Sequence, residues 1–119
     1  MRSWRNAAAG ALLSLAGGAA FAHALVTASS PANGAVLAAA PAEVSITFNE
    51  KVEKLFSKAT LNDARGSTVS TAKARVDQAN PAVLRLALPA LAPGKYVVKW
   101  TAVGVDGHRR AGDIAFSIK

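Results

Sequence analysis

Apolar and polar residues alternate with a period of two in four segments, and this pattern constrains the fold of the chain more than any other feature. Because successive side chains of a β-strand point to opposite faces, such alternation is typical of strands that bury one face of a sheet. The inward-facing residues of these predicted strands are Val44, Ile46 and Phe48; Leu84, Leu86 and Leu88; Tyr96, Val98 and Trp100; and Ile114, Phe116 and Ile118. We therefore interpret Tyr96 and Trp100 as core residues rather than as a surface platform for a cofactor or carbohydrate.

Three further segments alternate less clearly, because small or polar residues interrupt them, and we predict weaker strands at 24–29, 58–63 and 67–74. Glycine, proline, asparagine and aspartate mark turns at 30–34, 65–66, 80–81, 93–94 and 106–107. The alanine-rich stretch 35–42 is predicted to be a surface connection. Short strands separated by such turns predict an all-β fold of about seven strands, either a β-sandwich or a small Greek-key barrel.

Residues 1–22 have the three parts of a secretory signal. Arg2 and Arg5 are basic, an apolar run covers 7–20, and the small residues Ala20 and Ala22 precede a cleavage site. The run is too short for a comfortable membrane span, which needs about 20 apolar residues. We predict cleavage after Ala22, export to the periplasm, and a single mature domain over residues 23–119.

The charged and sulfur-containing residues argue against nucleic-acid binding and against a metal site with sulfur ligands. The net charge of +7 falls to +5 when Arg2 and Arg5 leave with the signal, and the remaining basic residues are scattered along the chain. A nucleic-acid surface needs clustered charge and stacking aromatics, so we predict no nucleic-acid partner. The chain has no cysteine, and its sole methionine is Met1, so the mature protein offers a metal no sulfur ligand.

The two histidines of the chain, His23 and His108, are candidate metal ligands. After cleavage, His23 would offer both an α-amine and an imidazole, and His108 follows Asp106 and Gly107. Either feature alone is weak, since Asp-Gly is also a favoured hairpin turn. Together they supply three nitrogens and one oxygen, a set that suits tetragonal Cu(II) and with which zinc is also compatible. In an extended segment Asp106 and His108, two residues apart, would point to the same side and could face one ion.

Four segments resemble the CopC family of periplasmic copper-resistance proteins: His23-Ala24-Leu25, residues 41–50, residues 91–100, and Asp106-Gly107-His108 followed by Gly112 and Phe116. The resemblance covers essentially all of residues 23–119. It implies an immunoglobulin-like, or cupredoxin-like, Greek-key β-sandwich. It also implies a Cu(II) site formed by the amine and imidazole of His23 with Asp106 and His108.

The resemblance bears on three further points. Glu50 matches a family position near the metal, where it is either a weak axial or outer-sphere group or an exposed acid at a strand end. Family members with a Cu(I) site carry a methionine-rich loop, whereas residues 59–78 contain no methionine, so we expect a site for Cu(II) only. The implied function is to sequester or deliver copper in copper resistance or homeostasis, with an inner-membrane partner of the CopD type and without enzymatic activity.

Two other functions are compatible with parts of this sequence. An N-terminal histidine with a second histidine is also the copper brace of lytic polysaccharide monooxygenases, although this domain is short for that fold. Asp106 as a fourth equatorial ligand would also block the open position that oxygen chemistry needs. The third hypothesis is a metal-free sandwich for adhesion or assembly.

Overall fold

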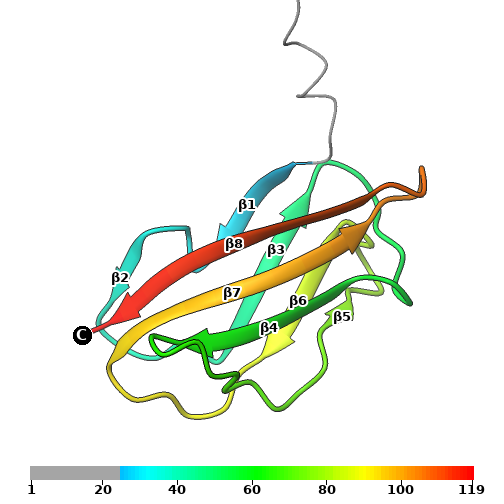
Figure 1. The fold of residues 1–119 in the computed structure, drawn as a ribbon. Helices are drawn as coiled ribbons and strands as arrows, with labels where there is room; N and C mark the ends of the chain where they lie inside the picture. The colour runs from blue at the N-terminus through cyan, green and yellow to red at the C-terminus, as the bar shows by residue number, and fades with distance from the viewer. Residues whose placement is uncertain (1–24) are drawn as a thin grey trace, which may run out of the picture.

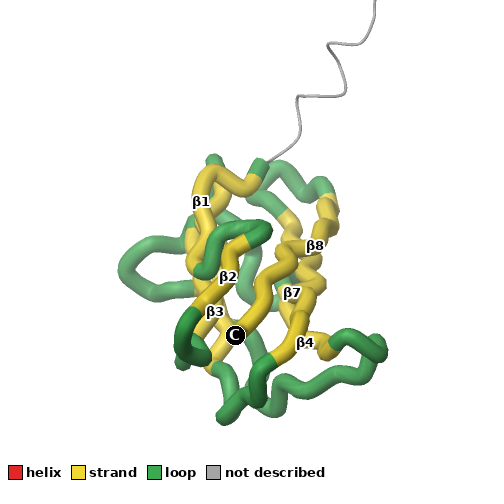
Figure 2. Tube along the Cα trace, turned by 90° about the vertical axis from the view of Figure 1, so that its left-hand side faces the viewer, coloured by secondary structure: helices red, strands yellow, loops and turns green. Residues whose placement is uncertain are grey.

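The computed structural model describes residues 25–119, which form a sandwich of two four-stranded sheets (Figures 1 and 2). One sheet has the strand order β1-β3-β6-β5 and the other β2-β8-β7-β4. The strands are β1 Val26–Ser30, β2 Ala35–Leu37, β3 Glu43–Phe48, β4 Lys58–Asp63, β5 Arg75–Val76, β6 Val83–Ala87, β7 Gly94–Val103 and β8 Arg109–Ile118. Residues 25–119 contain no helix, and so no helix of this part could cross a membrane.

The four strands with clear alternation are confirmed as β3, β6, β7 and β8. Their inward-facing residues are buried and pack together in one core between the sheets, except Leu88, which lies half-buried just beyond β6. Tyr96 and Trp100 are core residues as predicted, and the Tyr96 hydroxyl donates a hydrogen bond to the Ala92 carbonyl at 2.6 Å. The all-β sandwich predicted from the alternation is therefore the observed fold, with eight strands.

A packing contact in this core fixes the strand ends that lead to the candidate site. Trp100 of β7 packs edge-on against Phe48, the last residue of β3, with ring centroids 5.0 Å apart. Gly112 lies opposite Trp100 in the β7–β8 pair, where a Cβ atom would come within 2.7 Å of the indole Cζ2. A glycine there leaves room for the indole, which in turn holds the ends of β3 and β7 together.

The predicted strand at 67–74 is wrong. This segment instead runs along the outer edge of β4, where the Val69 amide donates to the Leu61 carbonyl at 2.8 Å and the Ser70 hydroxyl accepts from the Leu61 amide at 3.0 Å. A serine side chain here replaces a backbone group, so no regular ladder forms. The next strand after β4 begins only beyond this segment, as the two-residue strand β5.

The prediction of a surface connection at 35–42 is wrong for its first three residues. Ala35–Leu37 form β2, which pairs in parallel with the end of β8, with Ala35 opposite Phe116 and Leu37 opposite Ile118. This strand depends on a partner about 80 residues away in the chain, and no local pattern reports such a partner.

Candidate metal centre

The connection between β7 and β8, residues 104–108, carries Asp106 and His108 at one end of the sandwich (Figure 1). The backbone forms a tight turn, because the Gly107 amide donates to the Gly104 carbonyl at 2.9 Å and the Gly104 amide donates to the His108 carbonyl at 3.1 Å. Gly107 has a φ of 84°, in the left-handed region that favours glycine. Asp106 and His108 therefore do not lie in the extended segment that we expected.

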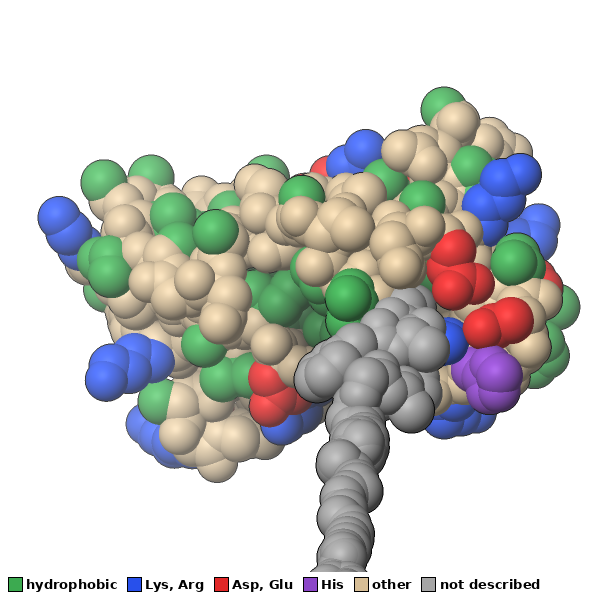
Figure 3. Space-filling view, turned by 90° about the horizontal axis from the view of Figure 1, so that it is seen from above, with side chains coloured by type: hydrophobic (Ala, Val, Ile, Leu, Met, Phe, Trp, Pro, Cys, Tyr) green, Lys and Arg blue, Asp and Glu red, His purple; other side chains and the backbone are tan. Residues whose placement is uncertain are grey.

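The turn nevertheless brings the two side chains together. His108 Nδ1 lies 3.1 Å from Asp106 Oδ2, and the His108 amide donates to Asp106 Oδ1 at 3.0 Å. The imidazole is 75% exposed and the Asp106 side chain 41%, so both are open to an ion from solvent. Figure 3 shows the histidine at this end of the molecule beside two acidic side chains.

The separation of these two atoms fits a shared metal. Two donors about 2.0 Å from one metal and at a right angle to each other are about 2.8 Å apart. The observed 3.1 Å between His108 Nδ1 and Asp106 Oδ2 is close to this value. An ion held by both atoms would therefore require little movement of either side chain.

Arg110 supports the Asp106 carboxylate from behind. Its Nη2 donates to Asp106 Oδ2 at 3.2 Å, its Nη1 donates to the His108 carbonyl at 3.1 Å, and its side chain is only 10% exposed. The Arg110 guanidinium, followed by the amide and imidazole of His108, holds the pKa of the Asp106 carboxyl far below its usual range. Asp106 therefore remains a charged donor even in mildly acidic solution.

Arg110 was not among the predicted site residues, although the alternation in β8 contains a signal for it. In β8, Arg110 shares the period-two phase of Gly112, Ile114 and Phe116, and it therefore starts on the inward side of the strand. A basic residue at an inward-facing position of a strand, such as Arg110, is rarely buried without a partner. With Asp106 four residues earlier, it is a candidate for a structural ion pair.

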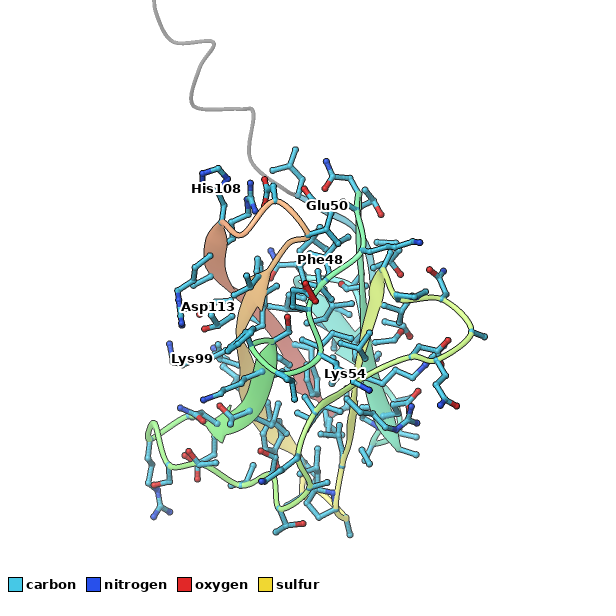
Figure 4. The ribbon with its side chains drawn as sticks, turned by 90° about the vertical axis from the view of Figure 1, so that its right-hand side faces the viewer. Phe48, Glu50, Lys54, Lys99, His108 and Asp113 are labelled. Atoms are coloured by element: carbon cyan, nitrogen blue, oxygen red, sulfur yellow. The ribbon has the colours of Figure 1, made fainter. Side chains whose placement is uncertain are left out.

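Glu50 lies two residues beyond the end of β3 and packs half-buried against the same turn. A Cβ atom at Gly104 would lie 3.0 Å from Asp106 Oδ1 and 2.9 Å from Glu50 Cδ, so both carboxyl groups pass close over the Gly104 backbone. Figure 4 shows Glu50 and His108 at the same end of the sandwich. The need for glycine at 104 was not visible in the sequence, because it arises from this contact between distant segments.

The described chain begins beside this cluster. The Leu25 amide donates to Asn49 Oδ1 at 3.2 Å, and the Asn49 amide donates to the Leu25 carbonyl at 3.1 Å, next to Glu50. The predicted ligand His23 lies outside the described residues. Within residues 25–119 no group of three or more His, Cys, Asp or Glu side chains is arranged to hold a metal.

The CopC domain model matches residues 26–119 of the chain. The chain belongs to the CopC family. The family comprises copper resistance and copper transport proteins, so the resemblance noted in the sequence is confirmed.

Three similar proteins illustrate the range of CopC relatives. Protein YobA of Escherichia coli K12 is 36% identical over 119 residues, which cover 99% of this chain and 96% of YobA. Copper transport protein CutJ of Bacillus subtilis is 38% identical over 82% of this chain, but the match covers only 18% of CutJ. The crystal structure of CopC from Methylosinus trichosporium OB3b superposes with a TM-score of 0.77 and 32% identity, covering 82% of this chain and 94% of that one.

Proposed function

We propose that the chain is an exported, periplasmic Cu(II)-binding protein that sequesters or delivers copper and is not an enzyme. Its proposed ligands are the amine and imidazole of His23, together with Asp106 and His108. The observation that carries the proposal is the open Asp106–His108 pair, whose Oδ2 and Nδ1 atoms are 3.1 Å apart. Membership of a copper resistance and transport family makes copper the ion to expect at this pair.

The position of Leu25 supports His23 as the missing donor. Two residues of extended chain span at most about 7 Å, so the hydrogen bonds of Leu25 to Asn49 limit how far His23 can lie from the loop that carries Glu50. Cleavage after Ala22 would give His23 a free amine within that reach. The amine and imidazole would then complete a set of three nitrogens and one oxygen.

The donor types favour the oxidised ion. Nitrogen and carboxylate donors in a tetragonal plane suit Cu(II), whereas Cu(I) prefers thiolate or thioether sulfur, which a chain starting at His23 does not contain. Glu50 beside Asp106 adds negative charge at the site and would act as an axial or outer-sphere group. The charge of a divalent ion would then be offset by two carboxylates.

A membrane partner of the CopD type is part of this proposal. The domain similar to this chain makes up 18% of CutJ, a protein named for copper transport, so in that relative it is joined to a much longer polypeptide. We propose that this domain meets a transport protein of that type and exchanges copper with it.

The test is a metal titration of the protein purified from the periplasm, with its intact mass measured to establish the cleavage site. We expect one Cu(II) per chain and an electron paramagnetic resonance spectrum of tetragonal type with nitrogen hyperfine structure. His108→Ala should change that spectrum. A stoichiometry near two, or an unchanged spectrum in His108→Ala, would contradict the proposed ligands.

The same sample separates the alternative functions. A copper-brace oxidase should produce peroxide from oxygen and ascorbate, whereas a carrier with Asp106 in the fourth equatorial position should not. A metal-free adhesion domain should give no saturable Cu(II) binding at all.

A further inference from the structure

Two large apolar side chains, Leu55 and Phe56, project from a turn in the β3–β4 connection. Leu55 is 76% exposed and Phe56 is 56% exposed. The turn is closed by a hydrogen bond from the Phe56 amide to the Glu53 carbonyl at 3.2 Å. Single exposed apolar residues are ordinary, but an adjacent leucine and phenylalanine at the tip of a turn form an apolar protrusion.

Lysines lie on one side of this protrusion, and Glu53 precedes it in the turn. A hollow of about 510 Å³ beside it is lined by Lys54, Lys58 and Lys73, with apolar walls from Leu55, Ala59 and Ala74. No acidic residue lines the hollow. We call the surface formed by Leu55, Phe56 and these three lysines the basic apolar surface.

The basic apolar surface is linked to the candidate metal centre through the β3–β4 connection. The β3–β4 connection, which carries Lys54, Leu55 and Phe56, runs antiparallel to the end of β7, with a bridge between Val52 and Gly104 and a 2.7 Å hydrogen bond from the Glu53 amide to the Val103 carbonyl. In Figure 1 the β3–β4 connection and the β7–β8 turn lie at the same end of the sandwich. Val105, in that turn, is a further exposed apolar residue.

We propose that the basic apolar surface docks on a bilayer of anionic phospholipids. Leucine and phenylalanine are the side chains that enter the interface between headgroups and acyl chains, and lysines beside them attract the anionic headgroups. Each lysine near such a surface adds a similar amount to the free energy of binding. Three lysines and two apolar side chains together therefore give reversible binding to the bilayer. Docking in this way holds the metal centre beside the membrane, where copper passes to or from a membrane protein.

This inference rests on the proposed export of the chain, but its test needs no copper. The metal-free protein is mixed with vesicles of phosphatidylglycerol and phosphatidylethanolamine, or of phosphatidylcholine alone, and the bound fraction is measured by sedimentation. We expect binding to the anionic vesicles that weakens as salt is added, and little binding to phosphatidylcholine. Equal binding to both compositions would overturn the proposal.

Two variants test the residues, each against a matched control. Leu55→Ser/Phe56→Ser and Lys54→Glu/Lys58→Glu should each weaken partition to anionic vesicles by about tenfold or more. Val36→Ser, at another exposed apolar residue, and Arg65→Glu/Lys95→Glu, with the same change in net charge, should leave partition within about twofold. Because all these side chains are exposed, the thermal transitions and Cu(II) affinities should stay as in the unmodified protein.

Three outcomes would overturn the docking surface. The first is wild-type partition in both test variants, and the second is an equal loss in the test and control variants. The third is binding to native inner membranes that disappears after protease treatment and is absent from protein-free vesicles, since this would assign the surface to a protein partner. Unaltered vesicle binding with no Cu(II) binding would instead contradict only the proposed function.

Discussion

His108 Nδ1 and Asp106 Oδ2 lie 3.1 Å apart at the tip of the β7–β8 hairpin. The turn, the left-handed Gly107 and the Arg110 guanidinium hold this pair, so its geometry is set by the fold. If this pair binds an ion as proposed, little reorganisation of the two side chains is needed, and such preorganisation strengthens binding.

Asp106→Asn should weaken Cu(II) binding by about 10- to 100-fold or more, because it keeps the shape of the side chain but removes its charge. Asp113→Asn is the matched control, since Asp113 is an exposed acid of β8 paired with Lys99 at 3.3 Å and away from the turn. A competition titration with a Cu(II) chelator measures both. Equal losses in the two variants would mean that general charge, rather than coordination by Asp106, supports binding.

Gly104→Ala should also weaken Cu(II) binding, because the new Cβ would press on the carboxyl groups of Glu50 and Asp106. The backbone at 104 does not require glycine for its dihedral angles, so the metal-free protein should lose little thermal stability. Adding Glu50→Ala removes the closest contact, so the double variant should lose less Cu(II) affinity than the sum of the losses in the two single variants. An affinity unchanged by Gly104→Ala would show that the carboxyl groups are free to move away.

Cu(II) affinity should fall as the pH drops from about 7 to 5. The ordinary pKa of an α-amine is near 8 and that of a histidine imidazole near 6.5, and copper must displace the protons from both. Asp106 should contribute nothing in this range, because its lowered pKa keeps it ionised. Titrations at several pH values test this, and an affinity constant between pH 7 and 5 would contradict nitrogen ligation.

Asp106 should instead affect the stability of the metal-free fold at lower pH. A carboxyl whose pKa is depressed in the folded state stabilises that state above its ordinary pKa of 3.8, and the contribution is lost as pH falls toward the folded value. Wild type should therefore melt at a higher temperature than Asp106→Asn at neutral pH, and this difference should shrink progressively as the pH falls below about 3.8.

Cu(I) should bind weakly or not at all, because a chain starting at His23 contains neither methionine nor cysteine. A competition assay under anaerobic conditions with a Cu(I) chelator measures this. Tight one-to-one binding of Cu(I) would contradict a site for Cu(II) only.

Much of the fold could be predicted from local alternation. Four strands, β3, β6, β7 and β8, each bury one face in the core. Burial of one face requires an apolar side chain at every second residue, and this pattern is visible in the sequence. β2 could not be predicted, because its three residues form a strand only by pairing with the distant β8. The segment at 67–74 misled the prediction because its polar side chains bond to the edge of β4 in place of a ladder.

The candidate site could be predicted only in part. Asp106 and His108 stood out by their chemistry, and the structure places them in contact. The contributions of Gly104, Asn49 and Arg110 come from contacts across the sandwich end, which no single segment encodes.

The most direct test concerns His23, which carries the central claim. Cu(II) affinity is measured side by side for the protein that begins at His23 and for one with a single residue added before it. The added residue converts the amine to an amide while every side chain is kept, so affinity should fall by at least about 10- to 100-fold with little change in metal-free thermal stability. Equal affinities would show that His23 does not chelate through its terminal amine and would contradict the proposed site.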